Sequence, residues 1–497
     1  MRPLAPAVAA ALEAQNARLA PSPARDAHLA ALRAGAAAVV TGQQVGLFLG
    51  PLFTVYKAAS AIRLARALAA ESGRPVVPVF WLQTEDHDLP EIAVCHVPDA
   101  DGPRALAVPA AAHERVSIAH RLLPADVSDC LAALGATLGG LPHAAPHLDR
   151  LARHYRPGRG WGAAFAGLLG ELFAADGLVL LDPRDAALAA AAAPLHRRAL
   201  LDADAIAAAL TERHAALTRA GFAPPVHVRP GAPLAFFHPQ GAAGPRYRLT
   251  PAGDGFALVG GDAHVSRAHL LAALEAAPLS FSSSALLRPL VQDALLPTAA
   301  YVGGPAEVAY FAQLAPLYAS LELDMPLVVP RARLRVVDAR SARLLARLHL
   351  TPADAARPEA ELLAACAATA PAAAAGLAVR LLAPFETALD AVRGEIEPLG
   401  PGVHAAVDKT RANVAAAVRK LAGKVEQAHL HADADMVAAL RRVRQMLWPN
   451  DAPQERVYGL AYFAARVGEE AFLARVLEAV APAAWAVRDL WCDGEAR

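Results

Sequence analysis

Four consecutive ionisable side chains, Glu85-Asp86-His87-Asp88, are the residues best suited to chemistry, and they come just after an apolar run at 76–82. Crowded beside a buried strand, they repel one another and lose solvation, which perturbs their pKa values. In an extended chain Glu85 and His87 would face one way and Asp86 and Asp88 the other. His87 is then a candidate base for an attacking ammonium, and either aspartate could bind that ammonium or Mg²⁺. The alternative is a solvated acidic turn.

A second candidate is the loop 41–50, with sequence TGQQVGLFLG. Its glycines would let the backbone approach an anion, and the N–H groups ahead of Pro51 would point outward at the positive end of a helix dipole. The spacing of the glycines matches neither the dinucleotide fingerprint nor a P-loop. A tight strand-to-helix turn, in which the glutamines cap backbone groups, is equally well supported. The residues expected to bind ligand here are Thr41, Gly42, Gln43 and Gln44, since glutamine amides suit a carboxylate or a sugar hydroxyl.

Other cationic and glycine-rich positions could complete an anion site. Gly303-Gly304 precedes a proline that opens a predicted helix, and Arg288 and Arg331 could clamp a phosphate or carboxylate. Lone arginines more often pair with nearby acids. Lys57 faces back toward the 41–50 loop and could reach a phosphate, although a surface position is the default for a lysine.

Two further carboxylates are better explained by structure than by catalysis. Glu307 falls in the first turn of the helix after Gly304, where a negative charge stabilises the helix dipole, so we expect it to cap that helix. Asp293 lies between Gln292 and an apolar run, where a structural hydrogen bond is at least as well supported as a catalytic role.

A parallel sheet would position these residues. Short apolar runs at 37–40, 76–82, 178–181 and 326–329 predict buried strands, and a helix from Pro51 to Ser72 connects the first two. Polar residues at the carboxyl ends of such strands lie where open α/β sheets bind ligands. The stretch 286–331 repeats the layout of the first unit, which predicts that both belong to one sheet of an α/β fold.

The remaining segments predict an insertion and a helical C-terminal part. Short apolar runs between Pro/Gly turns, beginning with 226–228, indicate a small antiparallel β insertion. Apolar residues at heptad spacing on both sides of a turn at 399–402 indicate an antiparallel helical hairpin with a coiled-coil seam, or alternatively ordinary core helices. The predicted divisions are 1–221 and 266–380 for the two halves of the core, 222–265 for the insertion, 381–430 for the hairpin and 431–497 for C-terminal helices that pack on the core.

Composition narrows the classes of function. The 497 residues include 47 basic and 47 acidic side chains, and this balance favours neither nucleic acid nor an anionic membrane as a partner. The one long uncharged window, 34–56, is interrupted by polar residues and by Gly50-Pro51, so it does not predict a membrane span. Four widely spaced cysteines and the lack of a clear signal peptide predict a cytoplasmic protein without a structural zinc or a disulfide framework.

Several of these segments together resemble a known family, the cysteine ligases of bacillithiol synthesis, or BshC family. The matching segments are spread over nearly the whole chain. They are TGQQ with GLF and GPL from Thr41, YKA at 56–58, PVFW and EDHD between 78 and 88, RP with QD at 288–293, LPT at 296–298, YVGGPAE from Tyr301, QL at 313–314, MP with PR at 325–331, and PQER at 453–456.

The resemblance implies a Rossmann-like core with connecting insertions and a coiled-coil arm, which would make a homodimer. It also implies the last step of bacillithiol assembly, in which the carboxyl group of cysteine is joined to the amine of glucosaminyl malate. Amide formation from a free carboxylate is uphill in water, so an activated cysteine is expected, through ATP or another nucleotide, with Mg²⁺ allowed but no residue assigned to a resident metal. In this interpretation His87 and its carboxylate neighbours handle the amine, while the 41–44 loop, Tyr301 and the 303–305 turn hold anionic groups.

Two other functions are compatible with the sequence. One is nucleotidyl transfer on the same kind of fold, in which AMP would stay on the product. The other is a non-catalytic scaffold that uses the helical hairpin to hold partners. The density of polar residues at the predicted strand ends argues against an inert core.

Overall fold

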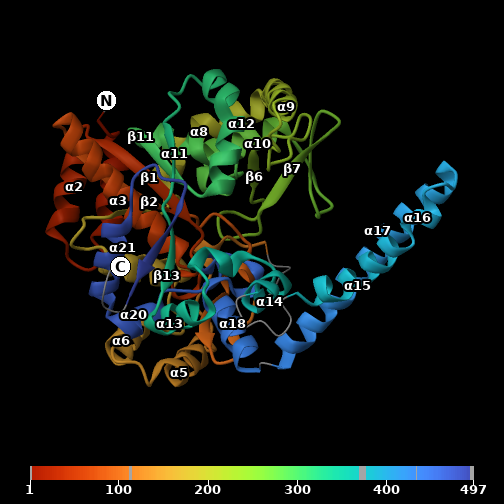
Figure 1. Ribbon diagram of the computed structural model, residues 1–497. Coiled ribbons are helices and arrows are strands. Elements are labelled where there is room, and N and C mark those ends of the chain that lie inside the picture. The colour runs from red at the N-terminus through yellow and green to blue at the C-terminus, as the bar shows by residue number, and fades with distance from the viewer. Residues whose placement is uncertain (1–2, 111–114, 369–375, 433, 493–497) are drawn as a thin grey trace. The chain divides into compact units, whose positions relative to one another are not determined.

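A computed structural model describes residues 3–110, 115–368, 376–432 and 434–492 (Figure 1). The chain forms two compact units, residues 1–335 with 455–490 and residues 336–454 with 491–497. The sequence analysis set the end of the core at 380 and assigned all of 431–497 to helices on the core. In the structure 336–380 and 431–454 belong instead to the second unit, and residues 369–375 lie outside the described residues.

The first unit is built on the parallel sheet that the sequence predicts. Its strand order is β12-β11-β1-β2-β5, and every neighbouring pair is parallel. The carboxyl ends of the strands therefore meet at one edge, and the two distant stretches of sequence do form one sheet. The strands are β1 (Ala37–Gln43), β2 (Val76–Leu82), β5 (Val179–Leu181), β11 (Thr298–Gly303) and β12 (Leu327–Pro330).

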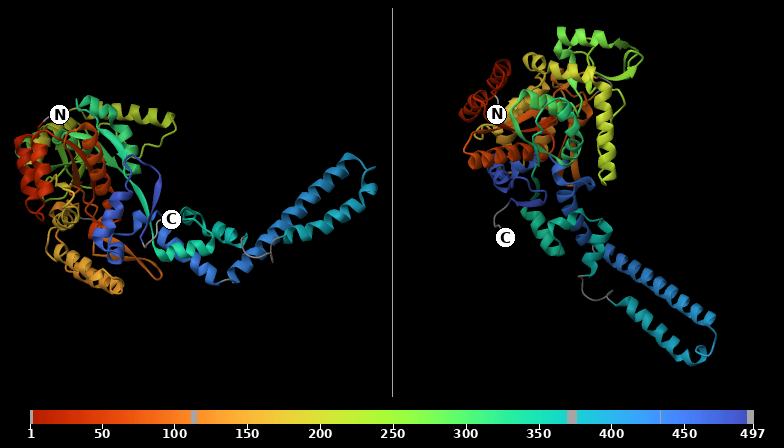
Figure 2. Two further views of the ribbon diagram at one scale, coloured as in Figure 1. Left: turned by 60° about the vertical axis from the view of Figure 1, so that its left-hand side comes forward. Right: turned by 90° about the horizontal axis from the view of Figure 1, so that it is seen from above.

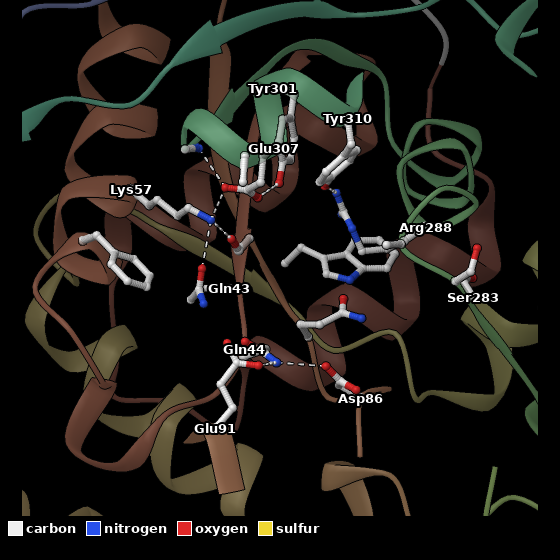
Figure 3. A pocket seen from close by; sticks show the side chains of 18 of the residues that line it. Gln43, Gln44, Lys57, Asp86, Glu91, Ser283, Arg288, Tyr301, Glu307 and Tyr310 are labelled. Carbon is white, nitrogen blue, oxygen red and sulfur yellow. Dashed lines mark hydrogen bonds and ion pairs between the residues drawn. The ribbon is translucent and has the colours of Figure 1, made fainter. Parts of the chain in front are cut away.

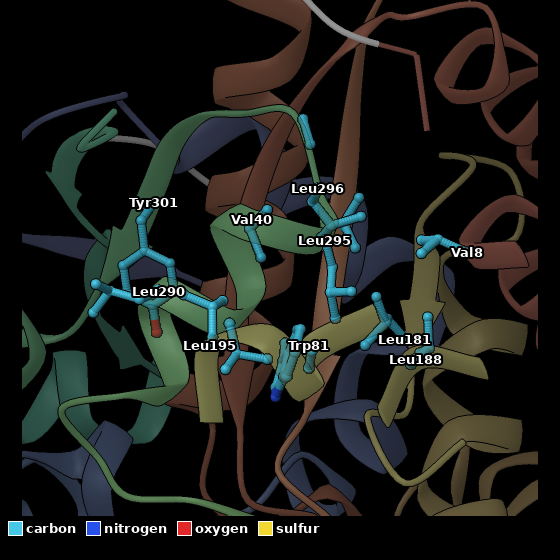
Figure 4. Packing of buried hydrophobic residues seen from close by; sticks show 14 of the residues in the cluster. Val8, Val40, Trp81, Leu181, Leu188, Leu195, Leu290, Leu295, Leu296 and Tyr301 are labelled. Carbon is cyan, nitrogen blue, oxygen red and sulfur yellow. The ribbon is translucent and has the colours of Figure 1, made fainter. Parts of the chain in front are cut away.

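Alternating side chains bury both faces of this sheet. Val39 packs on one face with Ala61 and Leu64 of α3 (Phe53–Ser72), while Val40 points to the opposite face with Trp81 (Figure 4). Near-continuous apolar runs are typical of such doubly covered parallel strands. The helices that cover the second face are α1 (Pro6–Asn16), α2 (Pro23–Arg33), α8 (Ala186–Leu201), α9 (Ala203–Arg219), α11 (Arg288–Leu295) and α12 (Pro305–Ser320).

The helix after β1 begins two residues later than predicted. Pro51 pairs with Gly459 in an isolated bridge, the N–H of Leu52 donates to the carbonyl of Tyr458 at 2.8 Å, and α3 starts at Phe53. The helix does end at Gly73, which has φ 65° and so adopts the left-handed conformation that glycine tolerates.

The predicted antiparallel insertion is present as a five-stranded sheet of order β10-β6-β7-β8-β9. The expected strand at 226–228 was wrong, because the backbone N–H and carbonyl of Val226 are both bonded by the side chain of Gln313 on α12. The strands are β6 (Ala235–Phe237), β7 (Tyr247–Ala252), β8 (Gly255–Leu258), β9 (His264–Ser266) and β10 (Phe281–Ser283), the last from beyond the predicted insertion.

Shorter elements complete the first unit. Within the described ranges, every helix of the protein is too short or too polar to span a membrane. The additional elements are the hairpin β3 (Val94–Asp99) and β4 (Gly102–Ala107), and the helices α4 (Leu89–Ile92), α5 (Val127–Leu138), α6 (Ala144–His154), α7 (Trp161–Leu172), α10 (Arg267–Ala276), α20 (Ala461–Val467) and α21 (Glu469–Ala479).

The second unit is helical and contains the predicted hairpin. Helix α15 (Leu377–Ala391) packs side by side with α17 (Pro401–Ala432), as Figure 2 shows, and Arg411 donates to Glu386 across them at 3.0 Å. The other elements are α13 (Ala339–Leu348), α14 (Glu359–Ala368), α16 (Arg393–Ile396) and α18 (Ala434–Leu447). The division between the units falls within α19 (Gln454–Val457) and within the two-stranded sheet of β13 (Arg333–Val337) and β14 (Val487–Trp491), most of whose residues belong to the first unit.

Candidate active site

A cleft of about 570 Å³ opens at the carboxyl ends of β1, β2 and β11 in the first unit (Figure 3). Gly42, Gln43 and Gln44 line it from the end of β1, and Asp86 and His87 line it from the segment after β2. The two segments that the sequence analysis singled out therefore meet at one cavity, where parallel strands end.

The four ionisable residues 85–88 do not point alternately to opposite sides, as they would in an extended chain, because the chain turns directly after β2. Glu85 is buried away from the cleft, where the N–H of Ser283 donates to its carboxylate at 3.4 Å. Burial raises the pKa of Glu85, and nearby Arg184 and Arg246 oppose that rise. Asp88 caps α4 through the N–H of Glu91. Only Asp86 and His87 of the four face the cleft.

His87 is suited to accept a proton. Its side chain is 34% exposed, and Nδ1 lies 3.6 Å from Oδ1 of Asp86. Burial and the charge of Arg246 lower its pKa below the usual value, with Asp86 and Asp88 opposing the shift. The imidazole is therefore neutral at neutral pH, which is the form that acts as a general base.

Gln44 bridges two carboxylates on the same side of the cleft. Its Nε2 donates to Oδ2 of Asp86 and to Oε2 of Glu91, both at 2.9 Å (Figure 3). The sequence analysis missed Glu91. Its signal was the Asp-x-x-Glu spacing from Asp88, which is typical of a helix start and places Glu91 in the first turn of α4.

Lys57 is buried at the cleft and not at the surface. Its Nζ donates to the carbonyl of Gly42 at 2.7 Å, to Oε1 of Gln43 at 2.9 Å and to Oε2 of Glu307 at 2.5 Å. These three acceptors match the three hydrogens of an ammonium group, so Lys57 is occupied by protein contacts. Its role is to hold the end of β1 against α12.

Glu307 caps α12, as expected, and also completes the Lys57 network. Its carboxylate accepts from the N–H of Gly304 at 2.8 Å and from the hydroxyl of Tyr301 at 2.5 Å. Burial alone would raise the pKa of Glu307, but Lys57 and these two donors hold it below its usual range. Gly304 lines the cleft, but Gly303 does not, and its carbonyl accepts from the N–H of Arg331.

The two predicted arginines differ in their partners. Arg331 pairs with Glu455 at 2.8 Å. Arg288 is buried, donates to Gln292 and to the hydroxyl of Tyr310, and lies over the rings of Trp81 and Tyr301 at 5.9 and 5.3 Å. No carboxylate among the described residues lies within 4.0 Å of its nitrogens. Arg288 thus brings a positive charge to the cleft that is not engaged in a direct ion pair, although the carboxylate of Glu307 acts on it from further away, and such a charge suits an anionic ligand group.

The loop 41–50 is a tight turn in which three N–H groups are bonded within the protein. The N–H of Gly46 donates to the carbonyl of Gln44, that of Leu49 to the hydroxyl of Tyr155, and that of Gly50 to the carbonyl of Leu47. Phe48 and Leu49 have positive φ, and a Cβ at Gly46 would lie 2.9 Å from the Cα of Gly50. Gly46 and Gly50 therefore serve the turn, and the N–H groups of Gly46, Leu49 and Gly50 are not available to an anion.

Two other predicted residues do not reach the cleft. The hydroxyl of Thr41 donates to the carbonyl of Val302. Asp293 accepts from the hydroxyl of Tyr318 and from Nε2 of Gln292, and burial raises its pKa to about 6. Both positions tie elements of the core together.

Sequence reasoning missed the residues that the inserted sheet brings to the cleft, namely Phe236, Arg246 and Ser283, and also Arg456, which lies over the ring of Phe53. Nothing near the first three in the sequence marks them, because only the pairing of β6, β7 and β10 places them together. Arg456 does belong to the PQER segment that carried the family resemblance.

Comparison with known proteins identifies the family. The model described as "Bacillithiol biosynthesis BshC, N-terminal Rossmann-like domain" matches residues 3–332, and that of the BshC C-terminal coiled-coil domain matches residues 335–487. The chain belongs to the BshC family. The resemblance drawn from its motifs, and the Rossmann-like and coiled-coil fold that it implied, are confirmed.

Individual relatives in the family match over most of their length, and each carries the name "putative cysteine ligase BshC". The chain is 36% identical to one from Koribacter versatilis, over 93% of this chain and 85% of the relative. It is 35% identical to one from Solibacter usitatus, over 87% of this chain and 80% of the relative. It is 32% identical to one from Symbiobacterium thermophilum, over 98% of this chain and 89% of the relative.

The carboxylates and the histidine at the cleft are not grouped as metal ligands. Among the residues that the structure describes, no three His, Cys, Asp or Glu side chains are grouped closely enough to hold an ion. Asp86 already shares the Gln44 amide with Glu91.

Proposed function

We propose that this chain is a ligase that joins the carboxyl group of cysteine to the amine of glucosaminyl malate, in the last step of bacillithiol biosynthesis. The family description and the name shared by its relatives support the class of reaction. The residue roles proposed below are argued from the geometry of the cleft.

The observation that carries the proposal is the division of charge across the cleft. Asp86, Glu91 and the neutral His87 lie on the side formed by β1 and β2, where Arg246 also lines the cleft, 3.9 Å from Asp86. Arg288 and Arg331 lie on the side formed by α11 and the β11–β12 edge, where Arg331 is paired with Glu455 and the carboxylate of Glu307 is paired with Lys57. A site of this kind receives an amine on its acidic side and a carboxylate or phosphate on its basic side.

His87 is the proposed general base. It takes a proton from the ammonium of glucosaminyl malate, and the free amine then attacks the activated carboxyl carbon of cysteine. The new C–N bond forms as the C–O bond from that carbon to the activating group breaks, the group leaves with that oxygen, and the nitrogen loses its second proton to the leaving group or to water. Asp86 stabilises the imidazolium that His87 becomes.

A nucleotide, with ATP the first choice, would supply the activating group. Arg288 fits this role because its guanidinium is buried at the cleft and forms no direct ion pair with a carboxylate of the described residues. Arg331 and the more exposed Arg456, both beside the ring of Phe53, would hold further phosphate or carboxylate oxygens.

The test is a complementation experiment. A strain that lacks the gene receives the wild type, His87→Gln or the matched control His269→Gln, whose exposed side chain on α10 is not part of the cleft. We expect the wild type and the control to restore the cysteinyl product, measured among low-molecular-weight thiols by mass spectrometry. His87→Gln should lower it by about 100-fold or more, the usual contribution of a general base, while the melting temperature stays unchanged.

Two results would contradict the proposal. An unchanged thiol profile in the deletion strain would favour the scaffold function, since no product would depend on the chain. Full activity of His87→Gln would show that His87 is not the general base. A product that retains AMP would instead support nucleotidyl transfer.

A further inference from the structure

Arg246, just before β7 of the inserted sheet, reaches the turn that carries His87. Its side chain is only 5% exposed, and Nη1 donates to the carbonyl of Glu85 and lies 3.9 Å from Oδ1 of Asp86. The guanidinium carbon lies 3.8 Å from the ring centroid of Phe236 on β6, which fixes the plane of the group. One side chain thus contacts both residues that precede His87.

Other contacts around this turn involve backbone or neutral groups. The hydroxyl of Ser117 donates to the carbonyl of Glu85 at 3.1 Å, and the N–H of Ile118 donates to the carbonyl of Asp86 at 2.8 Å. The N–H of Arg246 itself donates to the carbonyl of Arg115 at 2.8 Å, which ties β7 to the same segment. Arg246 is therefore the residue that brings a positive charge into direct contact with the turn.

The charged groups that act on His87 come from three segments. Asp86 and Asp88 stabilise the imidazolium, whereas Arg246 and Arg115 destabilise it. Arg246 has the larger effect of the two arginines, and it also pairs with Asp86. Removing Arg246 would thus withdraw a repulsive charge from His87 and release a carboxylate toward it, and both changes favour protonation.

We propose that Arg246 is a positioning residue, which holds the turn at Glu85 and Asp86 and keeps His87 facing the cleft as a neutral base. The inserted antiparallel sheet is then part of the active site and not an appendage to the core. The proposal rests on the role of His87 in the proposed function, but its test does not require ligase activity.

The experiment measures proton binding by His87 directly. The full-length protein is labelled with ring-¹³C histidine, and the His87 signal is assigned by its loss in His87→Gln. We expect Arg246→Met to raise the pKa of His87 toward that of an ordinary histidine. Arg246→Lys, which keeps the charge, should leave the pKa close to that of the wild type. Arg248→Met, a matched change two residues further along the chain at a position outside the cleft, should have no effect.

A second variant covers the case in which Arg246→Met does not fold. Phe236→Leu removes the ring that orients the guanidinium and should raise the pKa of His87 in the same direction. An unchanged His87 pKa in folded Arg246→Met, or in folded Phe236→Leu where the former does not fold, would overturn the proposal. Full activity of His87→Gln would overturn the proposed function and leave the measured effect of Arg246 standing, so the two failures are distinguishable.

Discussion

Lys57, which is buried, and Glu307, whose side chain is 19% exposed, form an ion pair at the cleft, and the hydrogen bonds around it decide whether it stabilises the fold. Paired charges lose hydration on burial, so they need every remaining polar atom to be satisfied. Lys57 has three acceptors, and Glu307 accepts from Lys57, Tyr301 and Gly304. The network joins α3 to α12 and so sets the width of the cleft at the end of β1.

Glu307→Gln tests this network at the scale of single residues. It leaves a buried ammonium without its counter-ion, so we expect a loss of about 3–5 kcal/mol in the free energy of unfolding at pH 7. The matched change Glu322→Gln, at an exposed carboxylate 3.9 Å from Arg198, should cost less than about 1 kcal/mol. Urea titrations monitored by circular dichroism compare the two, and equal losses would contradict a special role for Glu307.

The pH dependence of the same variant follows from the lowered pKa of Glu307. A carboxylate with a lower pKa in the folded state contributes stability above its unfolded pKa, about 4.3, and loses it as the pH falls through the folded value. The difference between wild type and Glu307→Gln should therefore shrink on acidification. A difference that stays constant down to the lowest pH at which both fold would contradict this assignment.

At the scale of elements, the packing of β1 on β2 explains Gly42 without a ligand. The strands align Gly42 with Trp81, and a Cβ at Gly42 would lie 2.9 Å from the Trp81 carbonyl oxygen. We expect Gly42→Ala to lower the free energy of unfolding by about 1–3 kcal/mol, because the backbone must shift. Gly140→Ala, where a Cβ meets nothing within 4 Å, is the control. If urea titrations give the two variants equal free energies of unfolding, β1 and β2 can move apart to admit the Cβ without a loss of stability, which would contradict this explanation of Gly42.

At the scale of the whole molecule, we expect the helical hairpin to make a homodimer. Val407, Val414 and Val418 are half-buried along the hairpin seam, but Leu421 and Val403 remain 51% and 40% exposed. Burial of such apolar surface favours association. Leu421→Glu combined with Val403→Glu should convert a dimer to a monomer in light scattering after size-exclusion chromatography. The control Thr410→Glu adds a charge at an exposed polar position of α17, and a monomeric wild type would refute the expectation.

The family and the main secondary structure could be read from the sequence because their signals are local. Apolar runs bounded by Gly and Pro located β1, β2, β5 and β12, and heptad spacing located the hairpin of α15 and α17. The rule that parallel strands end at one edge then brought Gln43 and Gln44 together with Asp86 and His87. Local patterns suffice here because hydrophobic periodicity reports burial directly.

Only the tertiary structure decided what each side chain contacts. Lys57 is satisfied by Glu307, 250 positions away, and Arg246 reaches Asp86 from an inserted sheet. The tertiary structure also separates the four ionisable residues 85–88, because it buries Glu85 and leaves His87 at the cleft. The physical reason is that burial and charge compensation depend on distances in space, which short-range residue patterns do not encode.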